Sequence, residues 1–258
     1  MEPLDLPGLP AARRSRRREE DYGAARAGLG ETPLPAEVDL RAPWHGVRDQ
    51  GHTASCVGWT IADSILRWHL VQAGRLEPDA RLSARQVWMS AKETDRQTDY
   101  PSTFLEEDGT SLKAGLDVAR KFGVVAEAAL PWDRGLALGS PDAFYASAHK
   151  IAAYFNLGDD AVPDRSSCFG RWRRWLFEQG PIAVLIKIDR NIEHAGPELD
   201  GFDEASVAGS HCAALFGYGP DHFLLRSSWG PGWGDGGYAR MSLAYTAAAV
   251  IESYGVTV

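Results

Sequence analysis

The chain has 258 residues, 44% of them hydrophobic, and carries a formal net charge of −8 together with 9 tryptophans. This composition predicts a folded globular protein with a sizeable core and excludes an intrinsically disordered chain. The negative charge argues against a nucleic-acid partner, because phosphate binding needs a basic surface, and no apolar run approaches the length of a membrane span.

Residues 1–33 form the first distinct segment of the chain. They are rich in Pro, Gly and Arg, and a basic run at 13–18 leads directly into an acidic run at 19–21. Opposite charge blocks without an apolar period predict a charged arm or a loosely packed extension. No apolar stretch lies beside the arginines, so we do not expect a secretory signal.

A loop of small and polar residues at 50–56 runs into the first long helix. The apolar residues that follow recur at helical spacing and predict a buried stripe: Val57, Ile61, Ile65, Leu66 and Trp68. Ser55 stands where an N-cap is expected, which puts Cys56 in or beside the first turn. Unpaired N–H groups and the helix dipole stabilise an anion there, and the thiolate is the nucleophilic form of cysteine. A small buried cysteine that only packs is the alternative interpretation at this point.

The remaining helices of the first half are marked by their ends. The helix that starts at Cys56 should end near Gly74, a C-cap glycine. A capping box predicts a second helix over 83–93, and a third is expected over 112–121 and ends before Gly123.

The second half of the chain is dominated by strands. One amphipathic helix is expected over 169–179, and the apolar run at 181–188 predicts a buried strand. Residues 211–218 and 223–226 flank a Gly-Pro turn and predict a hairpin, and a last strand should end near 254–258. Helices early and strands late predict an α+β fold.

Three short motifs carry the chemistry. Gln50 precedes Cys56 by six positions, His211 enters the first hairpin strand, and Ser-Trp-Gly-Pro-Gly-Trp-Gly follows at 228–234. In this order and spacing they resemble the papain-like cysteine peptidase family, from about Pro35 to the C-terminus. The resemblance implies a helical lobe at about 50–138, a β-barrel-like lobe at about 139–258, and a cleft between them.

The resemblance also implies a role for each motif residue. Cys56 would be the nucleophile that forms a thioester, and His211 would act as base and acid. Gln50 would donate to the oxyanion together with the Cys56 backbone N–H. Substrate-binding positions would be Gly109, Ser210 and Trp229. The partner would be a peptide or protein substrate, and neither a cofactor nor a metal site is expected.

The chain departs from the family at three positions. Ser227 stands where the family has the asparagine that orients the histidine, and a serine hydroxyl is a shorter, freely rotating acceptor. Val57 replaces a frequent tryptophan, and Thr53 replaces a cysteine that secreted members use in a disulfide. With three cysteines in all, this suggests a reducing, cytoplasmic location. A bridge between Cys168 and Cys212 remains an alternative.

Other functions stay open at the level of sequence. The same acyl-enzyme could pass to an amine, as in a ligase, cyclase or transferase, and Ser227 raises the alternative of a catalytically weak binding module. The arm has two interpretations as well. Residues 1–33 are either a solvated tail or a short pro-segment lying along the cleft of a catalytic domain that spans 34–258.

Overall fold

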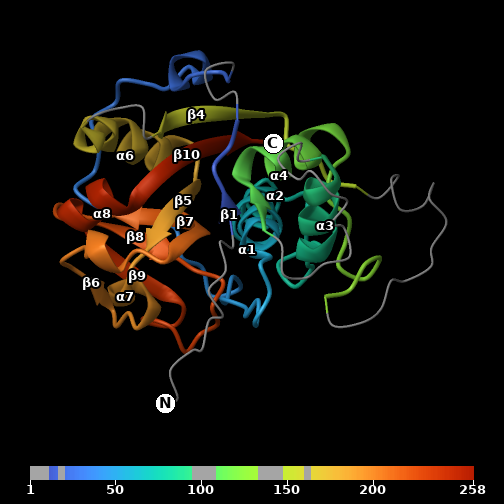
Figure 1. The fold of residues 1–258 in the computed structure, drawn as a ribbon. Helices are drawn as coiled ribbons and strands as arrows, with labels where there is room; N and C mark the ends of the chain where they lie inside the picture. The colour runs from blue at the N-terminus through green and yellow to red at the C-terminus, as the bar shows by residue number, and fades with distance from the viewer. Residues whose placement is uncertain (1–11, 17–20, 95–108, 133–147, 160–163) are drawn as a thin grey trace.

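The helices of the first half of the chain gather on one side of the molecule, and a mixed sheet with the later helices packed against it lies on the other (Figure 1), in agreement with the α+β prediction. The structure is a computed structural model and describes residues 12–16, 21–94, 109–132, 148–159 and 164–258. Within these ranges no helix combines the length and the apolar character needed to cross a membrane. The expected boundary between the lobes, at 138/139, falls outside the described residues.

The helical lobe is built around one continuous central helix. It comprises α1 (Cys56–Trp59), a π-helical segment η3 (Thr60–Leu66) and α2 (Arg67–Gln72), and it packs against α3 (Ala84–Thr94) and α4 (Leu112–Lys121). Two glycines allow this close packing. A Cβ on Gly58 would lie 2.2 Å from the Ala84 carbonyl oxygen, and one on Gly115 would lie 2.5 Å from the Ile61 side chain. All three predicted helices are confirmed.

The caps differ from the expectation at one helix. Ser83 caps α3 through a 3.0 Å bond from the Gln86 N–H, as predicted. Ser55 occupies the N-cap position of α1, but its side chain makes no capping bond and instead contacts the Thr53 hydroxyl at 2.6 Å. The capping role predicted for Ser55 is therefore wrong, and the first turn keeps its N–H groups for other partners.

One eight-stranded sheet forms the other lobe, in the order β4-β10-β5-β7-β8-β9-β6, with β2 added beside β7. Its strands are β2 (Val38–Asp39), β4 (Ala153–Asp159), β5 (Ile182–Ile188), β6 (Glu198–Leu199), β7 (Gly209–Tyr218), β8 (His222–Arg226), β9 (Tyr238–Ser242) and β10 (Val250–Thr257). Among the described residues the end strands β4 and β6 do not pair with each other, so the expected barrel-like lobe is an open sheet.

The central strands are apolar throughout because both faces of the sheet are covered. In β5, Val184 and Ile186 belong to a core shared with α6 (Phe169–Glu178), α7 (Arg190–Glu193) and α8 (Leu243–Ala249). The alternating residues Ala183 and Leu185 belong to the core shared with the central helix. The apolar run at 181–188 thus reflects burial on two sides.

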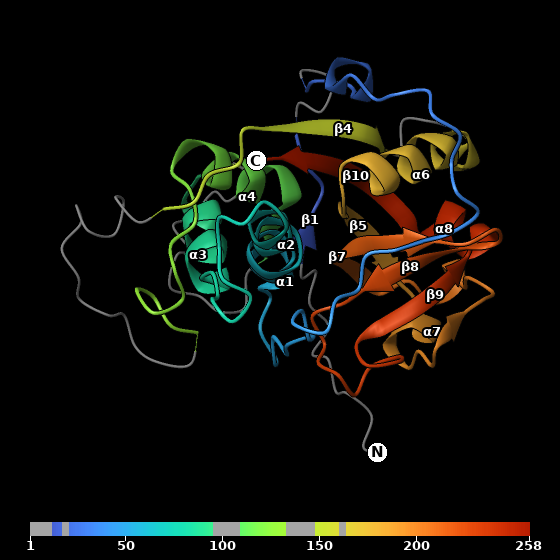
Figure 2. The same ribbon diagram turned by 180° about the vertical axis from the view of Figure 1, so that it is seen from behind.

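The described residues of the N-terminal arm, 12–16 and 21–33, are part of the folded molecule. Strand β1 (Ala12–Arg13) pairs in parallel with β3 (Thr110–Ser111), and Figure 2 shows it between the helices and the sheet. Ala12 and Ser15 are buried, with 2% and 6% of their surface exposed. Residues 21–33 continue over the outside of the sheet lobe (Figure 2), with a 3-10 turn η2 at Ala24–Ala27. For the described part of the arm, residues 12–16 and 21–33, the interpretation as a solvated tail is therefore wrong.

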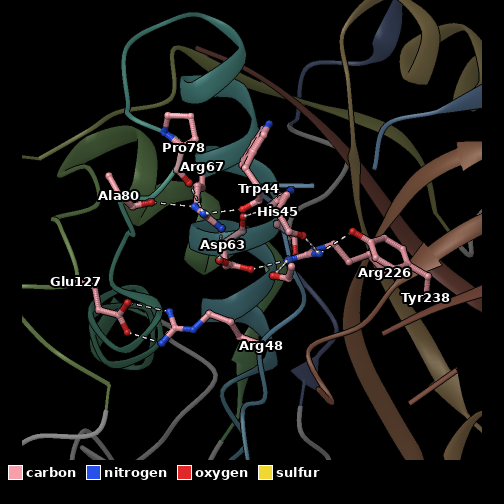
Figure 3. A network of polar contacts seen from close by, with 12 residues as sticks. Trp44, His45, Arg48, Asp63, Arg67, Pro78, Ala80, Glu127, Arg226 and Tyr238 are labelled. Carbon is pink, nitrogen blue, oxygen red and sulfur yellow. Dashed lines mark hydrogen bonds and ion pairs between the residues drawn. The ribbon is translucent and has the colours of Figure 1, made fainter. Parts of the chain in front are cut away.

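A buried polar network joins the two lobes (Figure 3). Arg226, at the end of β8, donates to Asp63 of η3 at 2.7 Å, to the His45 carbonyl at 2.8 Å and to the Tyr238 hydroxyl at 2.7 Å. Arg67 reaches the same carboxylate at 3.4 Å. Asp63 and Arg226 are 4% and 1% exposed. We call Asp63, Arg67 and Arg226 the interlobe clamp, because they tie the central helix to the sheet.

Two buried histidines make the stability of this lobe contact depend on pH. Burial and the charge of Arg226 lower the pKa of His45 to about 3, and burial lowers the pKa of His69 to about 4. In the unfolded chain both rings gain a proton below a pH of about 6.5. The free energy of unfolding should therefore fall as the pH drops below 6.5, by at most about 1.4 kcal/mol per pH unit for each histidine.

Urea unfolding between about pH 6.5 and pH 5 measures this slope. Few carboxylates titrate in that window, so the histidines dominate it. The variant His69→Phe keeps a ring in place and should flatten the slope. A stability that does not change over this window would contradict the neutral, buried state of both rings.

Candidate active site

Cys56 opens the central helix and lies at the junction of the two lobes. It is fully buried and belongs to the same apolar cluster as Cys212 of β7. Its position at the first helical residue comes from the loop at 50–55, whose Gly51 adopts a positive φ of 61°. A thiolate here has the helix N-terminus behind it and strand β7 in front of it.

His211, the third residue of β7, lies across from Cys56. Its Nε2 is 3.3 Å from the Ser227 hydroxyl, and its ring lies 4.2 Å from the Trp229 ring at an interplanar angle of 31°. Trp229 packs against the His211 ring, and the side chains of His211, Ser227 and Trp229 are all buried. Since Nε2 faces Ser227, Nδ1 is the ring nitrogen left for the sulfur of Cys56.

The surroundings of Cys56 favour its thiolate form. Burial by itself raises the pKa of this thiol, but the neighbouring side chains of Cys212 and His211, the charge of the imidazole and the Cys212 backbone N–H together lower it well below its ordinary value. At ordinary hydrogen-bond distances Nδ1 of His211 has no partner among the described residues. Catalytic hydrogen bonds are often long in unliganded enzymes, which agrees with this looser contact.

Gln50 is held firmly beside the nucleophile. Its Oε1 accepts from the Ser228 hydroxyl at 2.7 Å, and its Nε2 donates to the Thr53 carbonyl at 2.7 Å. Its backbone N–H also donates to the Ser228 carbonyl at 2.8 Å. These partners fix which end of the amide is the donor. A side-chain amide has two N–H groups, and the Thr53 carbonyl takes one of them.

Two of the three predicted substrate-binding positions, Gly109 and Ser210, lie beside the arm. Gly109 immediately precedes β3, the strand with which β1 pairs, and the Ser210 hydroxyl donates to the Ala12 carbonyl at 2.7 Å. The Ser15 N–H donates to the Glu252 carboxylate at 2.7 Å, and the Lys113 N–H donates to the Ser15 hydroxyl at 3.1 Å. The arm therefore lies across the place where the two lobes meet.

The structure brings together Cys56, His211, Gln50, Ser227 and Trp229, and it adds two residues that the sequence did not single out for the site. These are Cys212, next to the nucleophile, and Glu252, a fully buried carboxylate under the arm. The adjacency of Cys212 to His211 was the available signal. No local pattern marks Glu252, because its place depends on the register of the last strand.

The alternative disulfide is contradicted. All three cysteines are free thiols. Cys212 lies in the core between the lobes, whereas Cys168 belongs to the core on the opposite face of the sheet, close to Gly158. The sheet separates the two thiols, so they cannot meet without rearrangement of the fold.

Comparison with known sequences agrees with this geometry. Papain from Carica papaya is 52% identical over 46 residues, which cover 18% of this chain and 12% of papain. Cathepsin L from Sarcophaga peregrina is 25% identical over 222 residues, which cover 81% of this chain and 59% of that protein. The chain thus spans less than two thirds of the length of these curated relatives.

Comparison with solved structures shows the same fold. Xylellain, a cysteine protease from Xylella fastidiosa, superposes with a TM-score of 0.79 at 18% identity, over 95% of this chain and 94% of that one. Digestive procathepsin L 3 from the larval midgut of Tenebrio molitor gives a TM-score of 0.70 at 18% identity, over 97% and 77% of the two chains. The sequence model of the papain family cysteine proteases matches residues 34–258. The chain belongs to the papain family of cysteine proteases.

Proposed function

We propose that this chain is a thiol peptidase that cleaves peptide bonds through a thioester on Cys56. One observation carries the proposal: the Cys56 thiol lies against the imidazole of His211 at a helix N-terminus, and this lowers its pKa. A thiolate next to a histidine can attack a carbonyl carbon, and the histidine can then protonate the leaving amine.

Gln50 supplies the third element of this mechanism. The carbonyl oxygen becomes an oxyanion as the thiolate attacks, and in this proposal the second N–H of the Gln50 amide donates to it, together with the Cys56 backbone N–H. Ser228 holds the amide in this orientation through Oε1. Loss of one such donor in a well-studied hydrolase costs about 10²–10³ in rate.

We infer further that residues 1–33 act as a pro-segment. The arm pairs with β3 next to Gly109 and accepts a hydrogen bond from Ser210 beside His211. A peptide substrate needs the same groups, because main-chain pairing at an exposed strand is a general mode of peptide recognition. Solved neighbours that are proenzymes, such as procathepsin L 3, support this interpretation.

Product analysis tests the proposed activity. The chain without residues 1–33 is incubated with a denatured protein, and the fragments are identified by mass spectrometry. New N-termini are expected, and Cys56→Ala should abolish them. Addition of a small amine distinguishes hydrolysis from acyl transfer, because a transferase would attach the amine to the new C-termini. No fragments and no amine adducts from the active-site-intact protein would contradict the proposal.

Ser227 is the residue whose substitution is most informative about His211. The 3.3 Å contact to Nε2 is long, so Ser227→Asn, with its stiffer carbonyl acceptor, should raise kcat and leave KM nearly unchanged. A better hydrogen bond to a charged group is worth about 1.5–3 kcal/mol, which limits the gain to about 100-fold.

The companion variant Ser227→Ala shows whether the hydroxyl matters at all. A several-fold loss of kcat is expected, because the imidazole then keeps only its packing against Trp229. If alanine leaves kcat unchanged, Ser227 does not orient the histidine. In that case the mechanism reduces to Cys56 and His211.

A further inference from the structure

Cys56 has a second thiol as its neighbour. Cys212 follows His211 directly in β7, and the side chains of both residues interact with Cys56. The even-numbered residues Cys212, Ala214 and Phe216 all belong to the core that contains Cys56. Helix α1 packs directly on β7, and the side chain of Cys212 lies within hydrogen-bond reach of Cys56.

The contact between these thiols is a hydrogen bond. The S–H of Cys212 and its backbone N–H both donate to the sulfur of Cys56, which lowers the pKa of Cys56. Burial raises the pKa of Cys212, and the neighbouring Cys56 sulfur and Glu252 carboxylate raise it further. The pair therefore consists of one thiolate and one thiol in contact, both fully buried.

We propose that Cys212 is a resolving cysteine, which converts oxidised Cys56 into a reversible intramolecular disulfide. The oxidant is a peroxide. Its terminal oxygen transfers to the Cys56 thiolate and gives a sulfenic acid, while the other oxygen leaves as water after protonation. The Cys212 sulfur then attacks the sulfenic sulfur, a second water leaves with the Cys212 proton, and the S–S bond forms.

The environment of the pair favours this product over further oxidation. A sulfenic acid that has no thiol in reach is oxidised on to the irreversible sulfinic acid. Here the attacking thiol is in contact before oxidation begins, so the second step requires no diffusion of another molecule. Cys168 cannot compete, because it lies on the other face of the sheet. Reduction of the disulfide by a small dithiol regenerates both groups.

The full chain is titrated with hydrogen peroxide until Cys56 no longer reacts with N-ethylmaleimide in the unfolded, quenched protein. Peptide mapping then identifies the product. The expected result is a linked peptide containing Cys56 and Cys212 and a mass lower by two hydrogen atoms, both reversed by dithiothreitol. This readout does not depend on peptide hydrolysis, so it remains decisive if the proposed peptidase activity fails.

Two variants sharpen the test. In Cys212→Ala, Cys56 should gain two oxygen atoms as the sulfinic acid and should not be recovered by dithiothreitol. The matched control Cys168→Ala, which removes the remote thiol, should form the disulfide as the original chain does. A wild-type chain in which Cys56 is consumed while Cys212 stays free to alkylate would overturn the proposal, and it would do so even if Cys212→Ala does not fold.

Discussion

Removal of residues 1–33 is expected to raise the rate of peptide cleavage by about 100-fold. The arm is held over the site by the β1–β3 pairing, by the bonds of Ser15 and by an ion pair between Lys113 and Asp21. If these contacts together favour the covered state by about 3 kcal/mol, only about 1 in 100 molecules is open at any time. Truncation makes every molecule open.

The truncated domain should still unfold cooperatively, because both cores lie almost entirely within residues 38–258. Thermal unfolding followed by circular dichroism checks this beside the activity assay. A point variant provides the matched control. Ser15→Pro removes the N–H that binds Glu252 and should release part of the inhibition, whereas Ser15→Ala keeps that N–H and should release less. Unchanged activity after truncation would refute a pro-segment.

The second large effect is expected at the interlobe clamp. Arg226→Met should lower the free energy of unfolding by about 3–5 kcal/mol, because it leaves the buried carboxylate of Asp63 without its main partner. Arg226 also precedes Ser227 in the chain, so activity should fall more than the folded fraction accounts for. Urea unfolding and kcat, measured on the same samples, separate the two effects.

A surface ion pair serves as the control. Asp39 and Arg41 form a 2.6 Å contact on the exposed side of β2. Because surface pairs contribute about 1 kcal/mol or less, Asp39→Asn should hardly change stability. Rescue provides a further check, since Asp63→Asn combined with Arg226→Met removes both charges and should recover part of the lost stability. Similar, small effects of Arg226→Met and Asp39→Asn would show that the clamp does not hold the lobes together.

Local sequence patterns predicted most of the secondary structure. Hydrophobic periodicity and helix caps depend on only a few neighbouring residues, so they can be read from the sequence. Examples are the stripe from Val57 to Trp68, the capping box at Ser83 and the apolar run at 181–188. The π-helical segment Thr60–Leu66 was not predicted. This segment contains Asp63, whose carboxylate binds Arg226 and whose backbone carbonyl accepts a hydrogen bond from His45. Both contacts join distant parts of the chain, so no local pattern reports them.

The residues of the site also fall into those that a local pattern relates to one another and those that only the fold brings together. Gln50 and Cys56 lie in one local segment, so their spacing in the chain is enough to predict that they lie close together. The placement of His211 opposite Cys56 followed from the family resemblance, since no local pattern connects residues so far apart. Cys212 is the clearest example of a site residue that no local pattern predicts. The motif predicts its neighbour His211, but the contact of Cys212 with Cys56 depends on how β7 packs on the central helix.

The identity of the reactive thiol tests the central claim most directly. The chain without residues 1–33 is treated with an epoxysuccinyl inactivator at neutral and mildly acidic pH, and the adduct is located by intact mass and peptide mapping. We expect one adduct on Cys56 at both pH values, because its thiolate persists below the ordinary pKa of cysteine. His211→Ala should slow the reaction, most strongly at acidic pH. Equal modification of Cys56, Cys168 and Cys212, or none at Cys56, would contradict the assignment.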